Sequence, residues 1–315
     1  MNSCPPILLI VFNRPHLAAT VLDAIGKQRP SKLYIAADGP RDPALHPNDA
    51  YRCEECRNLA HTIDWPCEVL TKFSAINQGC GLAVSSAISW FFEHEKSGII
   101  LEDDCLPADD FFPYCAELLQ LYQDKKEVMA ICGNIFGAPQ SAQACAGYSY
   151  GFGRYAQVWG WATWARAWSL YHYEIGGSAD DFRYFKTRGV SYLQQKLHQE
   201  RVKSTNDPGG PNTWDYQWQF AVLKNEGLAI CPSVNLISNL GFGNDATHTL
   251  NANSENARAP IGKLSFPLKH PNTMKDAPSI NKIYADHMLG PANRHRKKLY
   301  KSYLRKLFRI GIINK

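Results

Sequence analysis

The stretch Gly98-Ile99-Ile100-Leu101-Glu102-Asp103-Asp104 places a short apolar run directly before three carboxylates. Its apolar residues are typical of a strand that is buried on both faces of a sheet. Charged side chains are rarely buried, so the acidic triplet should mark the carboxyl end of that strand, where open α/β sheets bind ligands. The stretch therefore predicts a ligand site at one edge of a buried sheet.

Three adjacent carboxylates repel one another, and a bound cation would offset that repulsion. Mn²⁺ or Mg²⁺ would suit, because hard cations prefer oxygen ligands, and the metal would in turn attract phosphate oxygens. The residues thus favour a metal-dependent enzyme that acts on nucleotide sugars. The competing interpretation is that acids here only cap a helix, as we expect of Asp109 or Asp110 before the next helical segment.

Apolar strands alternate with amphipathic helices through the first half of the chain. The expected strands are 6–12, 33–37, 67–73, 98–101 and 128–132, and the expected helices are 16–27, 54–63, 82–95 and 110–124. This alternation predicts an α/β fold with a mostly parallel central sheet and helices on both faces. Right-handed crossovers would then bring Asn13, Arg14, Asp38 and Gly39 to the same sheet edge as the acidic triplet.

Two further stretches of the sequence are typical of ligand contacts. Asn77 and Gly79 precede a helix, where glycines let backbone N–H groups approach a phosphate or ribose, although they also simply permit a tight turn. Residues 148–173 are crowded with aromatic side chains, which pack in cores or stack on sugars. Helical spacing from Trp161 onward favours packing, whereas Trp159 and Gly160, ahead of that segment, are better candidates for ligand contact.

The second half of the chain contributes a loop and two single candidate residues. Residues 203–213 are rich in glycine and proline, and a loop of this kind often serves as an active-site lid. Asp215 falls in the first turn of the next helix, as a general base or as a helix-favoured acid. Short strands are expected at 229–231 and 235–237. His248 follows, as a ligand of the metal, a contact of a diphosphate, or neither.

The chain has 315 residues, of which 45% are hydrophobic, and this is ample for one large domain. The net charge of +5 is unevenly placed, because residues 294–315 hold nine Lys or Arg and no acid. The other 25 basic and 29 acidic residues leave the body at about −4, so nucleic-acid binding is not supported. Apolar residues at helical spacing in this tail predict a basic amphipathic helix, which would lie on an anionic membrane surface, form a solvated tail or make an oligomer contact.

The sequence has no apolar run long enough to span a membrane or to form a signal-peptide core. Ten cysteines are scattered and several lie in expected core elements, which favours reduced thiols in a cytoplasmic protein. Cys53 and Cys56 could join Cys67 and Cys80 in a zinc site, but no second closely spaced pair exists, so this alternative is disfavoured.

In this order, these motifs resemble those of bacterial family-2-like glycosyltransferases of the GT-A fold, in particular relatives of N-acetylglucosaminyltransferase I. The shared features are the strand ending in Asn13-Arg14, the Asp38-Gly39 and Asn77-x-Gly79 motifs, and the acidic triplet before Asp110-Phe111-Phe112. The resemblance continues through Trp159-Gly160-Trp161, Trp214-Asp215 and residues 241–248. It implies a GT-A domain over residues 1–250. Residues 251–293 are polar and contain several prolines, and we expect them to form an irregular wrap before the tail helix over 294–315.

By position, the resemblance implies a role for each candidate residue. Asp38 would contact the nucleotide base with Asn13 and Arg14 nearby, and Glu102 and Asp103 would face the ribose and nucleotide. Asp104 would ligate Mn²⁺ or Mg²⁺, with His248 near the metal or diphosphate. Asp215 would be the base that deprotonates the acceptor. Unlike the family, which has two adjacent acids at this position, the chain continues with Tyr216 and Gln217.

The implied activity is an inverting transfer of a hexosyl or N-acetylhexosaminyl group from a nucleotide sugar, with UDP as the family-level expectation. The acceptor would be a glycan or a lipid-linked glycan in cell-surface polysaccharide synthesis, at the inner face of the plasma membrane. Two alternatives stay open: a nucleotidyltransferase, and a non-catalytic protein that binds nucleotide sugars or carbohydrates on the same fold.

Overall fold

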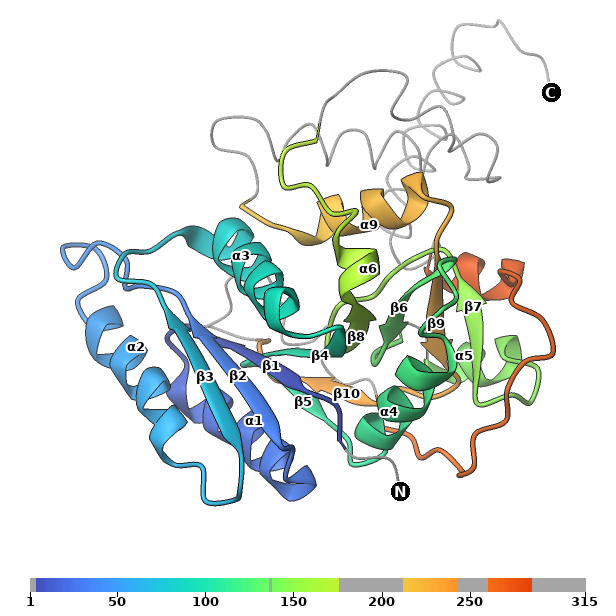
Figure 1. Ribbon diagram of the computed structural model, residues 1–315, viewed down its shortest axis with the longest axis horizontal. Coiled ribbons are helices and arrows are strands. Elements are labelled where there is room, and N and C mark those ends of the chain that lie inside the picture. The colour runs from blue at the N-terminus through green and yellow to red at the C-terminus, as the bar shows by residue number, and fades with distance from the viewer. Residues whose placement is uncertain (1–3, 136–137, 176–211, 243–259, 285–315) are drawn as a thin grey trace, which may run out of the picture.

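A computed structural model describes residues 4–135, 138–175, 212–242 and 260–284 (Figure 1). In this part of the chain a central sheet of eight strands has the order β3-β2-β1-β4-β8-β6-β9-β7. In chain order these strands are β1 (Ile7–Val11), β2 (Lys32–Ala37), β3 (Glu68–Phe73), β4 (Ser97–Glu102), β6 (Val128–Cys132), β7 (Tyr150–Gly153), β8 (Trp161–Trp164) and β9 (Leu228–Pro232). Residues 98–102 of the stretch Gly98–Asp104 belong to β4, at the middle of the sheet, and Asp103 and Asp104 follow it.

The directions of the strands confirm the predicted α/β class. β3, β2, β1 and β4 are parallel neighbours, and β6 and β9 form another parallel pair. β8 and β7 pair with their neighbours in the antiparallel sense. The sheet is therefore mostly parallel, with an antiparallel strand inserted between β4 and β6 and another at one edge.

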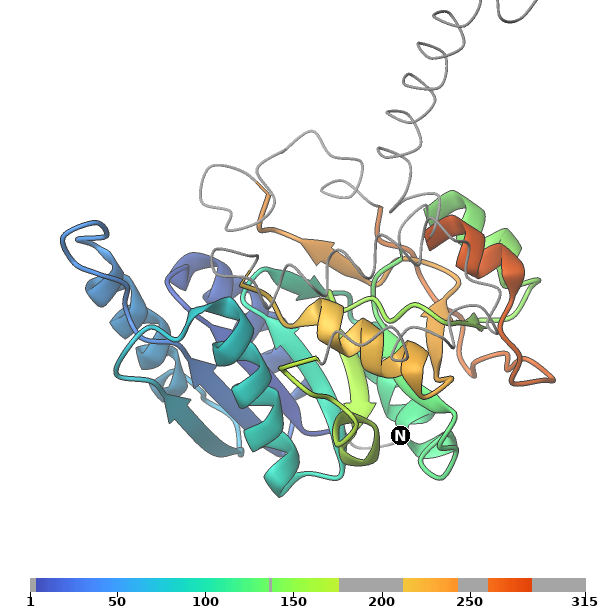
Figure 2. The ribbon, with the colours of Figure 1, turned by 90° about the horizontal axis from the view of Figure 1, so that it is seen from above.

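Helices cover both faces of the sheet (Figures 1 and 2). They are α1 (Pro15–Gln28), α2 (Asp49–Asn58), α3 (Gly79–His94), α4 (Phe111–Leu121), α5 (Ala138–Ala144), α6 (Ala165–Trp168) and α9 (Asp215–Lys224), with a short 3₁₀ turn at Leu59–His61. Residues of α1 and α4 belong to one buried apolar cluster, and residues of α3, α6 and α9 to a second one. Figure 1 shows α3, α6 and α9 above the sheet and α1 and α4 below it. The strands between them are buried on both sides.

The parallel register places the candidate residues at one edge of the sheet. Val11 of β1 pairs with Ala37 of β2, and Ile10 pairs with Glu102 of β4. The turns after these three strands therefore emerge side by side, as the crossover rule predicts. The chain after Glu102 turns at once into β5 (Cys105–Pro107), which pairs antiparallel with β10 (Ile237–Asn239) in a small second sheet.

The prediction of a helix from Trp161 is wrong for its first half, because residues 161–164 form β8. Their side chains follow the two-residue period of a strand: Trp161 and Trp164 belong to the apolar clusters on opposite faces of the sheet. Thr163 is buried and donates its hydroxyl hydrogen bond to the Met129 carbonyl at 2.6 Å. Only the final turn, α6, is helical. The tryptophan spacing fitted a helical face, but pairing with β4 and β6 overrides it.

Two other segments are displaced from their expected bounds. The helix expected at 54–63 begins earlier, at Asp49, and continues after Asn58 as the 3₁₀ turn. The strand expected at 235–237 lies at Ile237–Asn239, where its partner β5 fixes its position. Strands β5 and β7 were not expected at all. They have three and four residues, too few to display a period.

Residues 260–284 lie against the edge strand β7. The Ser149 N–H donates to the Lys269 carbonyl at 2.9 Å, and the Ala277 N–H donates to the Phe152 carbonyl at 2.8 Å. Asp276 forms an ion pair with Arg154, which follows β7. The described part of the expected wrap therefore attaches to the sheet by backbone hydrogen bonds. Most of the expected lid loop, His248 and the basic tail fall outside the described residues.

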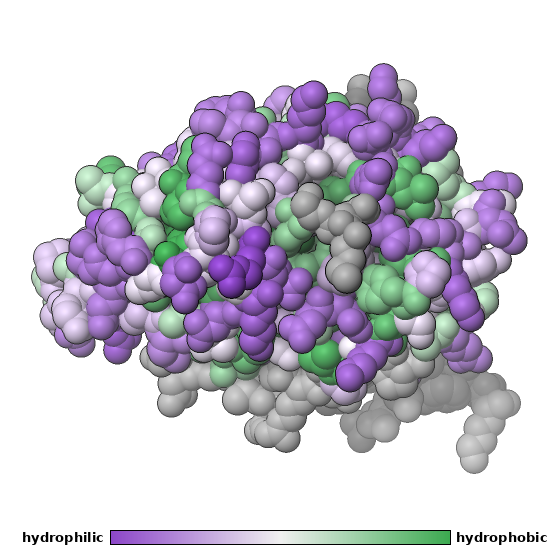
Figure 3. Space-filling view, turned by 60° about the horizontal axis from the view of Figure 1, so that its bottom comes forward, coloured by the Kyte–Doolittle hydropathy of each residue, from purple (hydrophilic) through white to green (hydrophobic). Residues whose placement is uncertain are grey.

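The molecular face drawn in Figure 3 carries mostly hydrophilic side chains, with smaller hydrophobic areas between them. Within the residues that the structure describes, no helix has the length and apolar character needed to cross a bilayer.

Substitution of Gly98 in β4 tests how tightly this strand packs against its neighbours. A Cβ at Gly98 would lie 2.3 Å from the Phe91 ring and 2.6 Å from the Pro6 carbonyl oxygen. Gly98→Ala should therefore lower the free energy of unfolding by about 1–3 kcal/mol, measured by urea denaturation. Gly26→Ala is the matched control, because it lies in α1 and its Cβ would approach only the Trp65 ring, at 3.1 Å. Equal effects of the two substitutions would contradict this account of β4.

Candidate functional site

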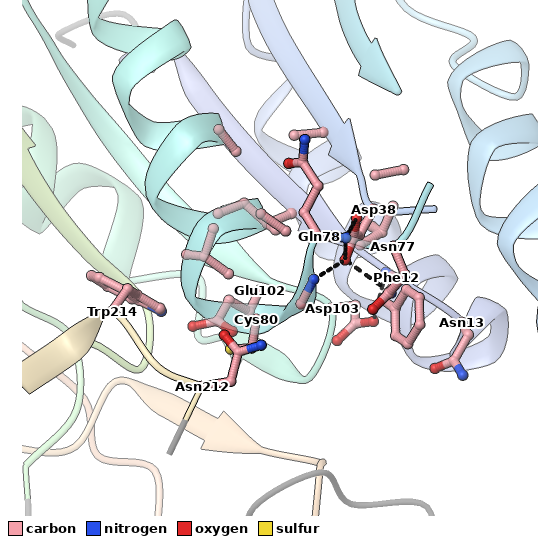
Figure 4. Close-up of a pocket in the computed structure, with 18 of the residues that line it drawn as sticks. Phe12, Asn13, Asp38, Asn77, Gln78, Cys80, Glu102, Asp103, Asn212 and Trp214 are labelled. Carbon is pink, nitrogen blue, oxygen red and sulfur yellow. Dashed lines mark hydrogen bonds between the residues drawn. The ribbon is translucent and has the colours of Figure 1, made fainter. Parts of the chain in front are cut away.

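A cavity of about 930 Å³ lies at the carboxyl ends of β1, β2 and β4. Its wall includes these residues that the sequence predicted for the site: Asn13, Arg14, Asp38, Asn77, Gly79, Glu102, Asp103, Asp104, Trp159 and Asp215. Figure 4 shows Trp214 toward one end of the cavity and Asn13 and Asp38 toward the other, with Glu102 and Asn212 between them. The acidic triplet and Asp215 thus share one cavity, although they lie more than 100 residues apart in the chain.

Asp38 joins the end of β2 to the start of α3. Its carboxylate accepts hydrogen bonds from the backbone N–H groups of Gly39 at 2.8 Å, Gln78 at 2.9 Å and Gly79 at 3.0 Å. The Asn77 side chain also donates a hydrogen bond to this carboxylate at 3.0 Å. Figure 4 draws hydrogen bonds around Asp38 as dashed lines. The first N–H groups of a helix lack partners within the helix, and Asp38 supplies the acceptor for some of them. Asp38 is therefore an anchor of the cavity wall.

Gly79, two residues after Asn77, lets the chain enter α3 through a left-handed backbone conformation. Gly79 has a φ of +78°, which side-chain-bearing residues rarely adopt. A Cβ at this position would also lie 2.0 Å from the Asn212 side-chain nitrogen. Asn212 accepts a hydrogen bond from the Gly81 N–H at 2.7 Å, so the segment before α9 is tied to the start of α3.

The acidic triplet carries more negative charge than its surroundings compensate. Burial, together with the neighbouring charges of Asp104 and Asp103, raises the pKa of Glu102 to about 8. Burial likewise raises the pKa of Asp103 to about 6, against the opposing effect of Arg14. Charge at this edge is therefore costly, and a further cation would lower the cost.

Arg14 is the cation that contacts the triplet. Its guanidinium donates to the Asp103 carboxylate, and its Nη1 lies 2.9 Å from Oδ2 of Asp104. Burial alone would lower the pKa of Arg14, but the charges of Asp103 and Asp104 raise it above its usual value. The guanidinium therefore stays charged between two carboxylates from the neighbouring strand end.

Asp215 is the first residue of α9 and lies on the far wall of the cavity. The Thr213 hydroxyl donates a hydrogen bond to its carboxylate. The preceding residue, Trp214, stacks on Trp161 of β8 with ring centroids 5.8 Å apart. Packing of these indoles fixes where α9 begins, and so where the Asp215 carboxylate enters the cavity.

Four of the sequence-predicted residues are not on the described cavity wall. Trp161 is 1% exposed and belongs to the core. Gly160 has a φ of +60° and packs against Ile237 and Leu101, and Gly39 packs against the backbone of Ile76. His248 lies outside the described residues. Trp159 is on the wall, edge-on to Phe242 with ring centroids 5.7 Å apart.

The cavity wall also contains basic side chains that sequence reasoning did not select: Arg41, His46, Arg52 and Lys72. Arg41 donates to Asp49 through Nη2 at 3.0 Å, and Asp49 also accepts from the Asn13 side chain at 2.8 Å. Hydrogen bonds from Arg41 lower the pKa of Asp49 to about 2, despite its burial. Arg41 could have been predicted as a site residue, because it follows the Asp38 turn at a strand end. No pattern in the sequence marks Arg52 on α2 or Lys72 on β3 as site residues.

The donor set at this edge fits a hard cation. Among the residues that the structure describes, no group of three or more His, Cys, Asp or Glu side chains could hold a metal by itself. Mg²⁺, however, is often bound by one or two carboxylates together with substrate phosphates. Asp104 could be such a carboxylate, because it lies on the wall of a large cavity and its acidic neighbours are only partly compensated. Cys53, Cys56, Cys67 and Cys80, the alternative zinc ligands, all lie in the described part of the chain and form no such group either.

No family model and no curated protein sequence matches this chain. Among solved structures, the chain is similar to a UTP-bound UGPase from Acinetobacter baumannii, with a TM-score of 0.34 and 8% identity over 73% of this chain and 85% of that one. It is also similar to the apo form of mouse xyloside xylosyltransferase 1, with a TM-score of 0.34 and 10% identity over 69% of this chain and 80% of that one. Both similarities are distant, and neither identifies a substrate.

The anchoring role of Asp38 is testable by its effect on stability. Asp38→Ala leaves several N–H donors without their acceptor and should lower the free energy of unfolding by about 1–2 kcal/mol in chemical denaturation. Asp42→Ala removes an exposed carboxylate that accepts, within the described residues, from the nearby Ala44 N–H, and it should change the free energy of unfolding by less than about 0.5 kcal/mol. An unchanged stability of Asp38→Ala would show that this carboxylate is not a structural anchor.

Proposed function

We propose that this protein is a metal-dependent, inverting glycosyltransferase that uses a nucleotide-sugar donor, with a UDP-sugar as the first candidate. The observation that carries the proposal is the shared cavity: Asp104 enters it from the end of β4, and Asp215 enters it from the start of α9. A group that holds a cation and a group that can accept a proton thus line one space large enough for a nucleotide sugar.

The basic side chains of the wall suit a donor with a negatively charged diphosphate. Arg41, Arg52 and Lys72 line the cavity near the strand ends, and Arg14 lies at the acidic triplet. The first N–H groups of α3 already donate to Asp38. Charged side chains rather than that helix start therefore supply the attraction for phosphates. Asp38 then shapes the nucleotide end of the cavity, with Asn13 and Asn77 as polar partners.

Asp104 is the metal ligand in this proposal, and Glu102 and Asp103 contribute negative charge beside it. When bound there, Mn²⁺ or Mg²⁺ would stabilise the charge that grows on the diphosphate leaving group, an effect worth several kcal/mol in metal enzymes. His248 is a second candidate ligand from the sequence.

Asp215 is the proposed general base. It takes the proton of the acceptor hydroxyl, whose oxygen forms a bond to the anomeric carbon while the bond from that carbon to the diphosphate oxygen breaks. Proton transfer of this kind contributes about 10²–10⁴-fold to a rate. Attack from the side opposite the leaving group inverts the anomeric centre. Thr213 orients the carboxylate, and Trp159 offers an aromatic face to a sugar.

The runner-up is a nucleotidyltransferase, which would attack the nucleotide's α-phosphorus and release pyrophosphate. Such enzymes usually carry a glycine-rich basic loop after the first strand, but the residues after β1 are Phe12, Asn13, Arg14 and Pro15. A binding protein without activity is disfavoured because both Asp104 and Asp215 are present. Product analysis separates the three: transfer releases a nucleoside diphosphate, nucleotidyl transfer releases pyrophosphate, and a binder releases neither.

Substitution of the two acids separates metal binding from proton transfer. Asp215→Asn should lower kcat by about 10²–10⁴-fold and leave donor binding unchanged, measured by product formation and calorimetry. Asp104→Ala should abolish transfer and remove the Mn²⁺ dependence of donor binding. The matched control is Asp64→Asn, an exposed acid outside the cavity. A near-normal kcat for Asp215→Asn, or a product of retained configuration, would exclude Asp215 as the base.

The basic tail suggests a glycan or lipid-linked acceptor at the inner face of the plasma membrane. Deleting residues 294–315, which hold nine Lys or Arg, should remove binding to phosphatidylglycerol vesicles but leave transfer to a water-soluble acceptor intact. Vesicle sedimentation measures the first and product formation the second, with neutral phosphatidylcholine vesicles as the control. Undiminished sedimentation of the truncated protein with anionic vesicles would contradict the membrane proposal.

A further inference from the structure

The side chain of Arg14 contacts one carboxylate oxygen of Asp104. Its Nη1 lies 2.9 Å from Oδ2 of Asp104, and its other terminal nitrogen, Nη2, donates to Asp103. The remaining oxygen of Asp104, Oδ1, accepts a weak hydrogen bond from the Cys105 thiol at 3.4 Å. Both oxygens of the proposed metal ligand therefore already have partners within the protein.

The backbone around Gly241 closes the other side of this ion pair. A Cβ at Gly241 would lie 2.1 Å from Oδ2 of Asp104 and 2.9 Å from Nη1 of Arg14. The preceding Leu240 N–H donates to the Asp104 carbonyl at 2.7 Å. Gly241 therefore packs directly on the contact between guanidinium and carboxylate, so a cation cannot simply be added beside Arg14.

The backbone of Arg14 is fixed, but its side chain has space to move. The Arg14 carbonyl accepts from the Leu17 and Ala18 N–H groups at the start of α1. Its side chain lines both the large cavity and a second cavity of about 320 Å³, whose wall includes Tyr51 and Glu55 of α2. The guanidinium can thus leave Asp104 for a neighbouring space that contains another carboxyl group. Because separate nitrogens contact Asp103 and Asp104, release of Asp104 does not require release of Asp103.

We propose that Arg14 is a resident counter-ion that competes with a divalent cation for Asp104. The guanidinium contacts Oδ2 from one side and the Gly241 backbone packs against it from another, so metal binding at this oxygen requires Arg14 to withdraw. The inference rests on the proposed metal role of Asp104. It assigns Arg14 a positioning function: in the absence of donor the Arg14–Asp104 pair keeps metal affinity low.

The competition links metal binding to donor binding. A released guanidinium retains its charge at the cavity wall, where the diphosphate of a donor would offer it new acceptors. Donor and metal would each favour the state in which Arg14 has left Asp104, and by linkage each would tighten binding of the other. The empty protein would be held in a state with its charges paired internally.

The test is a titration of the full-length protein with Mn²⁺ alone, followed by the electron paramagnetic resonance signal of free Mn²⁺. Arg14→Gln should bind Mn²⁺ about tenfold more tightly than the wild type, because the competing charge is gone. Arg14→Lys should fall between them, since an ammonium group is a weaker match for two carboxylates. Adding Asp104→Asn to Arg14→Gln should abolish the gain. An Arg14→Gln affinity equal to or below that of the wild type would overturn the proposal.

A matched control is available in another partly buried ion pair. Arg154 has the same side-chain exposure as Arg14, 15%, and pairs with Asp276 away from the cavity. Arg154→Gln should leave Mn²⁺ affinity unchanged, and an equal gain there would overturn the proposal. Circular dichroism and thermal melting verify that each variant folds, and Mn²⁺ should raise the melting temperature of Arg14→Gln more than that of the wild type.

The outcome is distinguishable from failure of the proposed function because the titration uses no donor. Tighter Mn²⁺ binding by Arg14→Gln without any sugar transfer by the wild type would support the competition and overturn the transferase. Mn²⁺-dependent transfer by the wild type with unaltered Mn²⁺ affinity in Arg14→Gln would support the transferase and overturn the competition.

Discussion

The arrangement of this site depends on negative charge concentrated at the end of a buried strand. β4 is covered on both faces, so Glu102, Asp103 and Asp104 leave the apolar interior directly into the cavity wall. Burial of these carboxyl groups is unfavourable, and the pKa values of Glu102 and Asp103 rise in consequence. Parallel pairing of β1 with β4 places Arg14 beside them, and this neighbour makes the cluster tolerable in the folded protein.

The carboxylate of Asp38, at the end of β2, has a different environment. Asp38 is surrounded by backbone N–H donors at the start of α3, which satisfy it without a counter-ion. Among the described contacts, no helix start donates N–H groups to the acidic triplet. The guanidinium of Arg14 instead offsets its negative charge. The same residue type thus serves as a structural anchor at the end of β2 and as an under-compensated charge at the end of β4, with β1 between the two strands. This difference directs a proposed cation to Asp104 rather than to Asp38.

Local pattern was sufficient to predict β1, β2, β4 and β6, because each of these strands is a buried apolar run. It failed where long-range pairing decides the structure. Trp161–Trp164 is a strand because β4 and β6 flank it, and β5 exists because residues 237–239 pair with it. The crossover rule brought the site residues to one edge, but it could not show that Arg14 reaches Asp104, a side-chain contact between residues 90 positions apart.

The position of Asp215 in the site depends on packing in the core. Its carboxylate lies at the start of α9, and Trp214 beside it stacks on Trp161, a buried residue of the strand next to β4. Asn212 accepts the hydrogen bond that ties this segment to α3. The spacing between the acidic triplet and Asp215 is therefore set by packing of tryptophans against the sheet, and not by either loop alone. A substitution that loosens these indoles would displace Asp215 relative to Asp104 without touching either acid.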